Sequence, residues 1–374
     1  MIKLLSIRNF KCFDRADVNL GSLTLLTGFN AAGKSTVLQS LLLLSQGLRS
    51  SLSKQHLPLN GALVRLGTAG DVIRRGSDGE IAFHVSGFDA DLEWSLSDAD
   101  RDVLDDPIHG ERLRIVSSPP EISSLQDNQK FLQGAVRDLV FLGATRHGRQ
   151  DVFPSPDDAD PVNGDVGSEG QFAPWLYVRN ADNPVEEEKR FPNDESVTFR
   201  AQVDAWLGHL FPGASANAAS ISGTSYSRLE FRLGRSSAWS RPANIGYGLS
   251  YAFPLVVALL SAHKGQVVVI DSPEAHLHPR AQSRMGEMIA QFANAGVQVL
   301  VETHSDHVLS GARLAVQKKA LKAEDLALHF FSGAQEEHGN GIVSPTIHSD
   351  GRLSDWPEGF FDQAEIDLMA LASH

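Results

Sequence analysis

Two stretches of the chain carry the apolar patterns that are typical of a parallel α/β core. Residues 23–27 form a short apolar run that favours a β-strand and stops at a glycine, and residues 34–45 have the leucine density of a buried helix. The same order returns later, where residues 266–270 and 297–302 predict buried strands and residues 279–294 predict the helix between them. The pattern therefore predicts an α/β core whose two parts are separated in sequence.

The segment between these two parts has a different pattern. Residues 81–85 and 91–96 alternate apolar and polar positions, as half-buried strands do. Residues 151–170 are rich in Asp, Pro and Gly, which is typical of a mobile loop with negative charge, either a lid or a linker. We therefore predict an inserted α+β lobe. The predicted division is a first core segment at 1–50, the lobe at 51–240, a second core segment at 241–335 and a small C-terminal domain at 336–374.

Composition narrows the class of protein. The 374 residues are 42% hydrophobic, which is enough to bury a core and excludes disorder as the dominant state. A formal net charge of -13 disfavours a purely electrostatic coat on nucleic acid, although a local basic groove stays open. The single cysteine, Cys12, excludes an intrachain disulfide and predicts a reducing compartment, so we expect the cytoplasm. The longest apolar stretches, 41–44 and 253–260, are far shorter than the roughly 20 residues that span a bilayer, so we expect no membrane association.

Residues 28–35 match the phosphate-binding pattern G-x-x-x-x-G-K-[ST], at the strand-to-helix junction that this pattern requires. The glycines let main-chain N–H groups curve around phosphate oxygens, and the helix N-terminus adds a favourable dipole. Lys34 is a catalytic candidate because its ammonium is expected at the β- and γ-phosphates, and Ser35 is expected to ligate Mg²⁺. The hydroxyl of Thr36 is expected near an inner phosphate. The candidate nucleotide-binding residues here are Asn30, Ala31, Ala32, Gly33, Lys34, Ser35 and Thr36.

Polar residues follow each of the two later strands. Asp271 ends an apolar strand, where P-loop proteins hold the carboxylate that orders Mg²⁺. His304 follows the next strand, where its imidazole would face the nucleotide and contact a γ-phosphate or an attacking water. A structural or capping role for His304 stays open. His276 and His278 have no cysteine nearby to complete a metal site, and we interpret them as surface or interface residues.

Together these residues resemble the ABC-type ATPases of the SMC, RecF and OLD (overcoming lysogenization defect) group. Residues 7–13, Ile-Arg-Asn-Phe-Lys-Cys-Phe, are similar to the first strand of that group, and residues 30–36 to its phosphate loop. Residues 271–279 resemble the OLD-like segment D/E-E-P-E-x-x-L-H-P, and residues 303–305 resemble its histidine switch. Residues 244–250 lie where the group has its signature loop, which reaches across a dimer interface to the ATP of the other subunit. The resemblance therefore adds Gly248 and Ser250 to the nucleotide-binding candidates.

The resemblance extends to residues 59–71, 141–146 and 166–170, and to a tail, residues 350–362, that is similar to an uncharacterised C-terminal domain of a prokaryotic OLD-like subgroup. It implies an ABC-type P-loop NTPase fold, ATP and Mg²⁺ as ligands, and a homodimer or higher oligomer. It also implies a role beside an effector protein, such as a nuclease, in prokaryotic anti-phage defence. The chain after His304 is short for the Toprim nuclease domain of OLD proteins, so we expect any nuclease to be a partner.

One position departs from the group. A glutamate that polarises the attacking water usually follows the magnesium-ordering acid, whereas this chain has Ser272, whose hydroxyl is a poor base. Three explanations stay open: Glu274 serves instead, His304 positions the water alone, or hydrolysis is slow and binding does the switching. We favour slow hydrolysis with Glu274 assisting as a catalytic residue.

Two other functions compete with an ATPase that drives a partner. A DNA-repair ATPase similar to RecF or SMC proteins would grip duplex DNA directly, through contacts of basic side chains with phosphates. The arginines available for this are Arg65, Arg74, Arg75, Arg146 and Arg149. A non-hydrolysing, ATP-dependent switch is the third possibility, and Ser272 is the residue that favours it.

Overall fold

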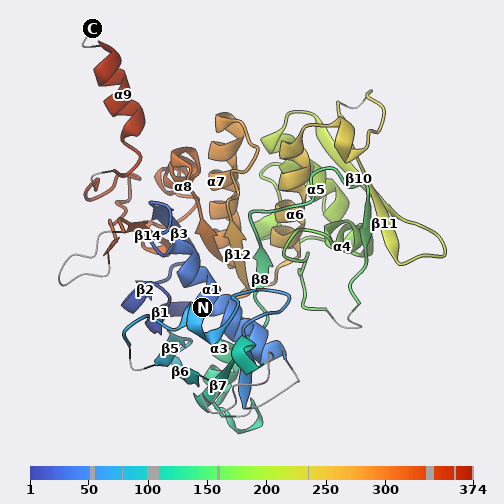
Figure 1. Ribbon diagram of the computed structural model, residues 1–374. Coiled ribbons are helices and arrows are strands. Elements are labelled where there is room, and N and C mark those ends of the chain that lie inside the picture. The colour runs from blue at the N-terminus through green and yellow to red at the C-terminus, as the bar shows by residue number, and fades with distance from the viewer. Residues whose placement is uncertain are drawn as a thin grey trace. The chain divides into compact units, whose positions relative to one another are not determined.

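The computed structural model describes all residues except 51–54, 78, 99–108, 121, 158–160, 235, 334–340, 358 and 373–374. The chain forms two compact units (Figure 1). The terminal unit consists of residues 2–133 together with residues 322–374, and the central unit consists of residues 134–321. The helix α3 (Asp127–Arg137) spans the boundary in sequence. Both units contain helices and strands, which confirms the predicted α/β class.

The terminal unit contains an antiparallel sheet. Its strands follow the order β2-β1-β5-β6-β7-β4. Phe10 and Phe83 pack edge to face at 5.1 Å in its core and join strands from distant parts of the sequence. The two alternating runs predicted at 81–85 and 91–96 are strands β5 and β6, as expected. The bounds are β1 (Ile2–Phe10), β2 (Phe13–Asn19), β4 (His56–Pro58), β5 (Glu80–Gly87), β6 (Ala90–Asp98) and β7 (Arg112–Ser117).

The predicted strand, loop and helix lie in the same unit. β3 (Leu23–Gly28) has five buried residues in succession, and α1 (Lys34–Arg49) begins at the predicted lysine. β14 (Leu326–Phe331) pairs with β3 in parallel, with Gly28 opposite Phe331, and β15 (Ile342–Val343) pairs with β14. A short helix, α2 (Ala69–Val72), precedes β5, and α9 (Gln363–Ala372) ends the described chain.

The central unit contains three parallel strands in the order β8-β12-β13. Two of these strands, β12 and β13, and the helix α7 between them were predicted from the sequence. The helices α7 and α8 pack closely, because Gly286 and Gly311 each leave room for the main chain of the other helix. The bounds are β8 (Val140–Leu142), β12 (Val267–Asp271), β13 (Gln298–Glu302), α6 (Tyr247–Ser261), α7 (Pro279–Asn294) and α8 (Asp306–Gln317).

A second, antiparallel sheet in the central unit has the order β10-β11-β9. Two helices beside it, α4 (Ala173–Asn180) and α5 (Phe199–Leu210), bury large aromatic side chains. The ring centroids of Tyr177 in α4 and Phe253 in α6 are 5.7 Å apart, and those of Trp206 in α5 and Phe292 in α7 are 5.2 Å apart. These contacts make α6 and α7 part of the core. The bounds are β9 (Val152–Pro154), α4 (Ala173–Asn180), α5 (Phe199–Leu210), β10 (Ala214–Ser220) and β11 (Tyr226–Leu233).

The two units divide the chain differently from the predicted domains. Residues 51–133 of the predicted lobe belong to the terminal unit, and residues 134–240 belong to the central unit. The domain boundaries given above stay a prediction. In the predicted loop 151–170, β9 joins a sheet and Asn163 donates a hydrogen bond to the carbonyl of Ser261 at the end of α6. Among the described helices, none has both the length and the hydropathy that crossing a bilayer requires.

Candidate functional site

The phosphate-binding motif forms the loop between β3 and α1 in the terminal unit. Gly28 and Gly33 have φ values of 124° and 109°, and Ala31 has a φ of 60°, so the loop depends on left-handed backbone. Side chains could not replace the two glycines, because a Cβ on Gly28 would collide with the main chain of Phe331 and one on Gly33 with the ring of Phe13. The sequence thus folds here into a tight turn that leads directly into a helix.

Lys34 lies across this loop. It is 3% exposed, and its Nζ donates hydrogen bonds to the main-chain carbonyls of Gly28 at 3.0 Å and Phe29 at 2.7 Å. The N-cap residue of α1 is Gly33, which has no side chain to cap the helix, and the first turn of α1 contains no acidic residue. The start of α1 therefore combines a cation with the positive end of a helix dipole, which favours an anion.

The other predicted residues of the loop divide by exposure. Asn30, Ala31 and Ser35 are exposed, whereas Thr36 is buried, with its hydroxyl 3.7 Å from Sγ of Cys12. The exposed hydroxyl of Ser35 is a hard oxygen donor of the kind that Mg²⁺ accepts. The predicted residues from Asn30 to Thr36 thus form this loop and the first turn of α1.

A pocket of about 430 Å³ lies beside the loop in the terminal unit. It is lined by Lys11, Cys12, Gly70, Asp71, Ile73, Arg74 and Arg75. Burial lowers the pKa of Lys11, whose Nζ donates a hydrogen bond of 2.7 Å to Gln39 of α1. Three cationic side chains against one carboxylate make the pocket attractive to a negatively charged ligand.

The acidic motif, residues 271–274, lies in the central unit, at the carboxyl ends of two parallel strands. Asp271 ends β12 and is paired in register with Glu302, which ends β13. The strand pairing continues for one more residue, because the N–H of Ser272 donates to the carbonyl of Glu302 at 2.9 Å. The residues that follow both strands therefore lie at one edge of the sheet.

Ser272 occupies the position where the ATPases that the sequence resembles have a glutamate, and its hydroxyl already has a partner. Its Oγ donates a hydrogen bond of 2.8 Å to Oδ1 of Asp271. The backbone of Ser272 has a φ of 52°, which few residues other than glycine adopt. Ser272 thus orients the carboxylate of Asp271.

Glu274 connects the two strand ends. Its Oε1 accepts the main-chain N–H of His304 at 2.8 Å, and its Oε2 accepts the hydroxyl of Thr303 at 2.8 Å. The side chain of His304 is exposed, while the next residue, Ser305, caps α8 through a 3.1 Å hydrogen bond from the N–H of Val308. The structure therefore brings Glu274 and His304 together, with the carboxylate acting on the backbone of the histidine.

Arg146, which follows β8, belongs to this cluster as well. It is 3% exposed, and its Nη2 donates to the carbonyl of Asp271 and, at 3.2 Å, to that of Ser272. Burial lowers its pKa to about 10, while Asp271 and Glu274 nearby act in the opposite direction. The side chain stays charged at neutral pH. The interpretation of Arg146 as a surface contact for DNA phosphates is therefore wrong, because its guanidinium is buried against the acidic motif.

The predicted signature loop leads into α6. Gly248 is buried so closely that a Cβ would lie 2.9 Å from the carbonyl oxygen of His276. The hydroxyl of Ser250 is buried and has no hydrogen-bond partner among the described residues. Tyr247 is partly exposed and stacks on His276, with ring centroids 5.3 Å apart. The first turn of α6 therefore contacts the segment that follows Asp271.

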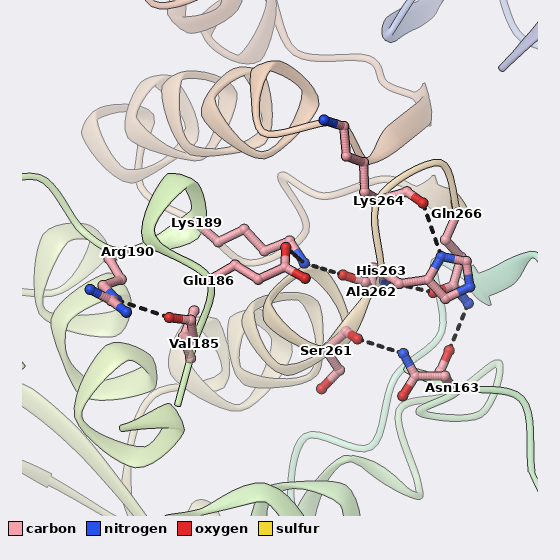
Figure 2. Close-up of polar contacts among 10 residues, drawn as sticks. All are labelled: Asn163, Val185, Glu186, Lys189, Arg190, Ser261, Ala262, His263, Lys264 and Gln266. Carbon is pink, nitrogen blue, oxygen red and sulfur yellow. Dashed lines mark hydrogen bonds and ion pairs between the residues drawn. The ribbon is translucent and has the colours of Figure 1, made fainter. Parts of the chain in front are cut away.

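Figure 2 shows the opposite end of α6, where polar side chains satisfy its last carbonyls. Nζ of Lys189 donates to the carbonyl of Ala262 and forms a 2.8 Å ion pair with Glu186. Nε2 of Gln266 donates to the carbonyl of Asn163 at 2.6 Å, just before β12 begins. The ammonium of Lys189 is favourable here because it lies at the negative end of the helix dipole. Asn163 bonds both to the end of α6 and to Gln266, and so links α6 to the start of β12.

Among the described residues, no cluster of three or more His, Cys, Asp or Glu side chains could hold a metal ion. His278 instead accepts the N–H of Arg280 at the start of α7. A nucleotide-dependent Mg²⁺ needs fewer protein ligands, because phosphates and waters supply the others. Ser35 in the terminal unit and Asp271 in the central unit each offer an oxygen donor of the kind that Mg²⁺ accepts. Sequence reasoning named Arg146 only as a possible DNA contact and Thr303 only as part of the histidine switch. It missed that Arg146 donates to the carbonyls of Asp271 and Ser272 and that Thr303 donates to Glu274.

Comparison with known families covers most of the chain. A family model described as "AAA domain, putative AbiEii toxin, Type IV TA system" matches residues 23–310. A second one, described as "Protein of unknown function (DUF3696)", matches residues 321–371. The first match contains the phosphate loop, Asp271 and His304.

One curated relative is the OLD nuclease of Thermus scotoductus, which is 38% identical over 58 residues. That match covers 16% of this chain and only 11% of the relative.

The solved structures that are similar include SMC head domains. One is the Smc head domain with an extended coiled coil bound to the C-terminal domain of ScpA from Pyrococcus furiosus, with a TM-score of 0.50, 12% identity and 99% coverage of both chains. Another, the SmcHead bound to the C-winged helix domain of ScpA, has a TM-score of 0.49 at 13% identity and covers 93% of this chain and 98% of that chain. The first likeness shows the P-loop NTPase fold. Because the first family model matches most of the chain, including the phosphate loop and both later motifs, the chain belongs to the AAA-domain family.

Proposed function

We propose that this protein binds ATP with Mg²⁺ and works as an ABC-type switch in the cytoplasm. ATP binding closes a homodimer, slow hydrolysis reopens it, and this change drives a partner protein. The observation that carries the proposal is the placement of Lys34, whose ammonium is buried against the carbonyls of Gly28 and Phe29 at the start of α1. A triphosphate would replace these carbonyls as the partner of the ammonium and would accept the N–H groups of the loop.

The pocket beside the loop supports a polyanionic ligand. Cys12 lines the pocket and also contacts Thr36, so the pocket adjoins the phosphate loop. Lys11, Arg74 and Arg75 give it a positive potential despite the -13 net charge of the whole chain. The positive potential of these three side chains attracts phosphates to the pocket, because nearby charges outweigh the distant negative charges of the chain.

The arrangement around Asp271 supports slow hydrolysis. We assign Ser35 and Asp271 to Mg²⁺, which when bound would neutralise charge on the β- and γ-phosphates. The hydroxyl of Ser272 donates a hydrogen bond to Asp271 and offers no base at the usual position. Glu274 acts through His304: it holds the backbone of the histidine, whose exposed side chain is proposed to contact the γ-phosphate or the attacking water.

The first turn of α6 is proposed to meet the ATP that the other subunit holds. Gly248 and Ser250 would contribute through their main chain, because the hydroxyl of Ser250 is buried. The named relative is a nuclease, which supports an effector nuclease as the partner and anti-phage defence as the setting. Direct binding of duplex DNA is the alternative, with the exposed Arg75 as one available contact.

Light scattering after gel filtration, with and without ATP, tests the proposal, and turnover is measured on the same samples with and without duplex DNA. We expect ATP to shift the wild type to a dimer, with turnover well below the about 10 s⁻¹ of a median enzyme. Lys34→Ala should abolish the shift. Lys318→Ala, which removes an exposed lysine paired with Glu287, is the matched control and should behave as the wild type.

An oligomer that ignores ATP, or a Lys34→Ala variant that responds like the wild type, would contradict the proposal. Strong stimulation by duplex DNA, together with an ATP-dependent DNA affinity that falls steeply with salt, would instead favour the repair function.

A further inference from the structure

We propose that Arg146 is a positioning residue of the nucleotide site: it clamps the turn that follows β12, so that Asp271 faces Mg²⁺ and Glu274 holds His304. This inference rests on the function proposed above. It assigns to Arg146 a role that follows from its contacts within the central unit.

The burial of Arg146 is the first observation. Its side chain is 3% exposed, yet Nε and Nη1 have no hydrogen-bond partner among the described residues. Burying a guanidinium with unmatched donors is unfavourable, and an apolar side chain of similar volume would fill the space at a lower cost. A residue that is kept in spite of this cost needs a role beyond filling the core.

The main-chain contacts of Arg146 define that role. Nη2 donates to the carbonyls of Asp271 and Ser272, which belong to the two peptide units after Asp271. Ser272 between them has a φ of 52°, a conformation that costs energy for a residue with a side chain. Two hydrogen bonds from one buried nitrogen hold both peptide units in place. Without them, the turn is free to relax toward ordinary backbone angles.

The orientation of the carboxylates of Asp271 and Glu274 depends on that turn. Asp271 precedes the clamped peptide units and Glu274 follows them, and both carboxylates interact electrostatically with the Arg146 cation. Because Glu274 in turn accepts the N–H of His304, rotation of the turn would move both the magnesium ligand and the histidine. The guanidinium also offsets repulsion between the two carboxylates and an incoming triphosphate.

Arg146 also contacts α6. Its guanidinium carbon lies 5.8 Å from the ring centroid of Tyr251, and that ring packs against His276 at 4.5 Å. Tyr251 belongs to the same helix as the predicted signature residues Gly248 and Ser250. The clamp therefore joins the acidic motif to the helix that is proposed to meet the second nucleotide.

The test compares ATP affinity in EDTA with ATP affinity in Mg²⁺, so that no turnover is needed. Arg146→Met removes the charge and the donors. We expect it to reduce the gain in affinity that Mg²⁺ provides by about tenfold, the usual cost of losing a residue that orients a metal ligand. Affinity in EDTA should stay within about twofold, because the contacts of Arg146 described above lie within the central unit, whereas the Lys34 loop belongs to the terminal unit. Arg146→Lys, which keeps a cation and a donor, should restore most of the gain.

A matched control separates positioning from stability. Lys189→Met removes another buried cation of the central unit that donates to a main-chain carbonyl, at the end of α6 that lies away from the acidic motif. It should lower the melting temperature and leave the Mg²⁺ effect unchanged. If Arg146→Met does not fold, Arg146→Gln carries the same test, because one neutral amide cannot replace the charged clamp.

Two results are decisive and can be told apart. An unchanged Mg²⁺ effect in a folded Arg146→Met or Arg146→Gln variant, or the same loss in Lys189→Met, overturns the positioning role. If the wild type itself shows no ATP binding that depends on Lys34, the proposed function fails, and the role of Arg146 fails with it.

Discussion

The main-chain N–H of His304 donates a 2.8 Å hydrogen bond to the carboxylate of Glu274. The second oxygen of that carboxylate accepts the hydroxyl of Thr303, so both oxygens of Glu274 have partners in the segment after β13. A carboxylate engaged in this way is suited to hold the histidine in place. It is less suited to take a proton from water, because each of its oxygens already accepts a hydrogen bond from the protein.

Substitution of Glu274 distinguishes these two roles. Gln at this position can still accept the N–H of His304 and can donate to the hydroxyl of Thr303. We therefore expect Glu274→Gln to keep ATP turnover within about threefold, whereas loss of a general base typically costs about 10²–10⁴-fold. Glu274→Ala should lose about tenfold, because the histidine segment is released. Steady-state phosphate release is the measurement, and a Gln variant as inactive as the Ala variant would indicate a base.

Ser272 is the position at which the chain departs from related ATPases. Ser272→Glu would place a carboxylate beside Asp271, where a general base is worth about 10²–10⁴-fold in rate. The φ of 52° imposes some strain on the new side chain, so we expect the lower part of that range. Single-turnover hydrolysis of ATP measures the change. Ser272→Ala is the control, since it removes the hydroxyl without adding a base, and no gain in the Glu variant would reject this explanation of slow turnover.

The contact between α7 and α8 depends on glycine. A Cβ on Gly311 would collide with the carbonyl of Ser283, so we expect Gly311→Ala to destabilise the protein by about 1–3 kcal/mol. Gly134 in α3 offers the matched control, because a Cβ added there would meet no other atom within 4 Å among the described residues. Gly134→Ala should raise stability by about 0.5–1 kcal/mol through helix propensity. Urea unfolding measures both, and equal effects would contradict the close packing.

The imidazole of His329 makes the terminal unit sensitive to acid. It is buried on β14, with Nε2 2.7 Å from the carbonyl of Asn19 and Nδ1 2.7 Å from the hydroxyl of Ser344. Burial lowers its pKa below the ordinary value of 6.5, so the folded protein binds fewer protons at this site than the unfolded chain. The stability that this group contributes is present above pH 6.5 and is lost as the pH falls through its lowered pKa.

Unfolding measured in urea at several pH values checks this expectation. The wild type should lose stability more steeply than His329→Gln below about pH 6.5, because the variant has no proton to take up at this position. Equal slopes for the two proteins would show that other groups cause the acid sensitivity.

Local patterns in the sequence were enough to predict the elements that carry the motifs. The run 23–27 and the glycine after it predicted β3, and Lys34 is the first residue of α1 as expected. Gly33 and Gly28 reveal the tight turn because only glycine tolerates both the backbone angle and the close neighbours at these positions. Such features depend on residues close in sequence, which is why one sequence suffices.

The contacts that organise the acidic motif could not be predicted in that way. Arg146 and Asp271 are 125 residues apart, and Glu274 and His304 are 30 residues apart, so folding alone brings each pair together. The pairing of β1 with β5 likewise joins a predicted core segment to part of the predicted lobe. Burial of a charged residue such as Arg146 is also contrary to its usual preference for the surface, and no local pattern signals it.

Direct measurement of ATP binding by Lys34→Ala tests the central claim most directly. Calorimetric titration of ATP with Mg²⁺ into the wild type should give saturable binding at one site per chain, and Lys34→Ala should weaken it by about a hundredfold, equivalent to about 2.7 kcal/mol. Lys318→Ala should bind as the wild type does. Equal ATP affinity in the wild type and Lys34→Ala would contradict the claim that the loop between β3 and α1 is the nucleotide site.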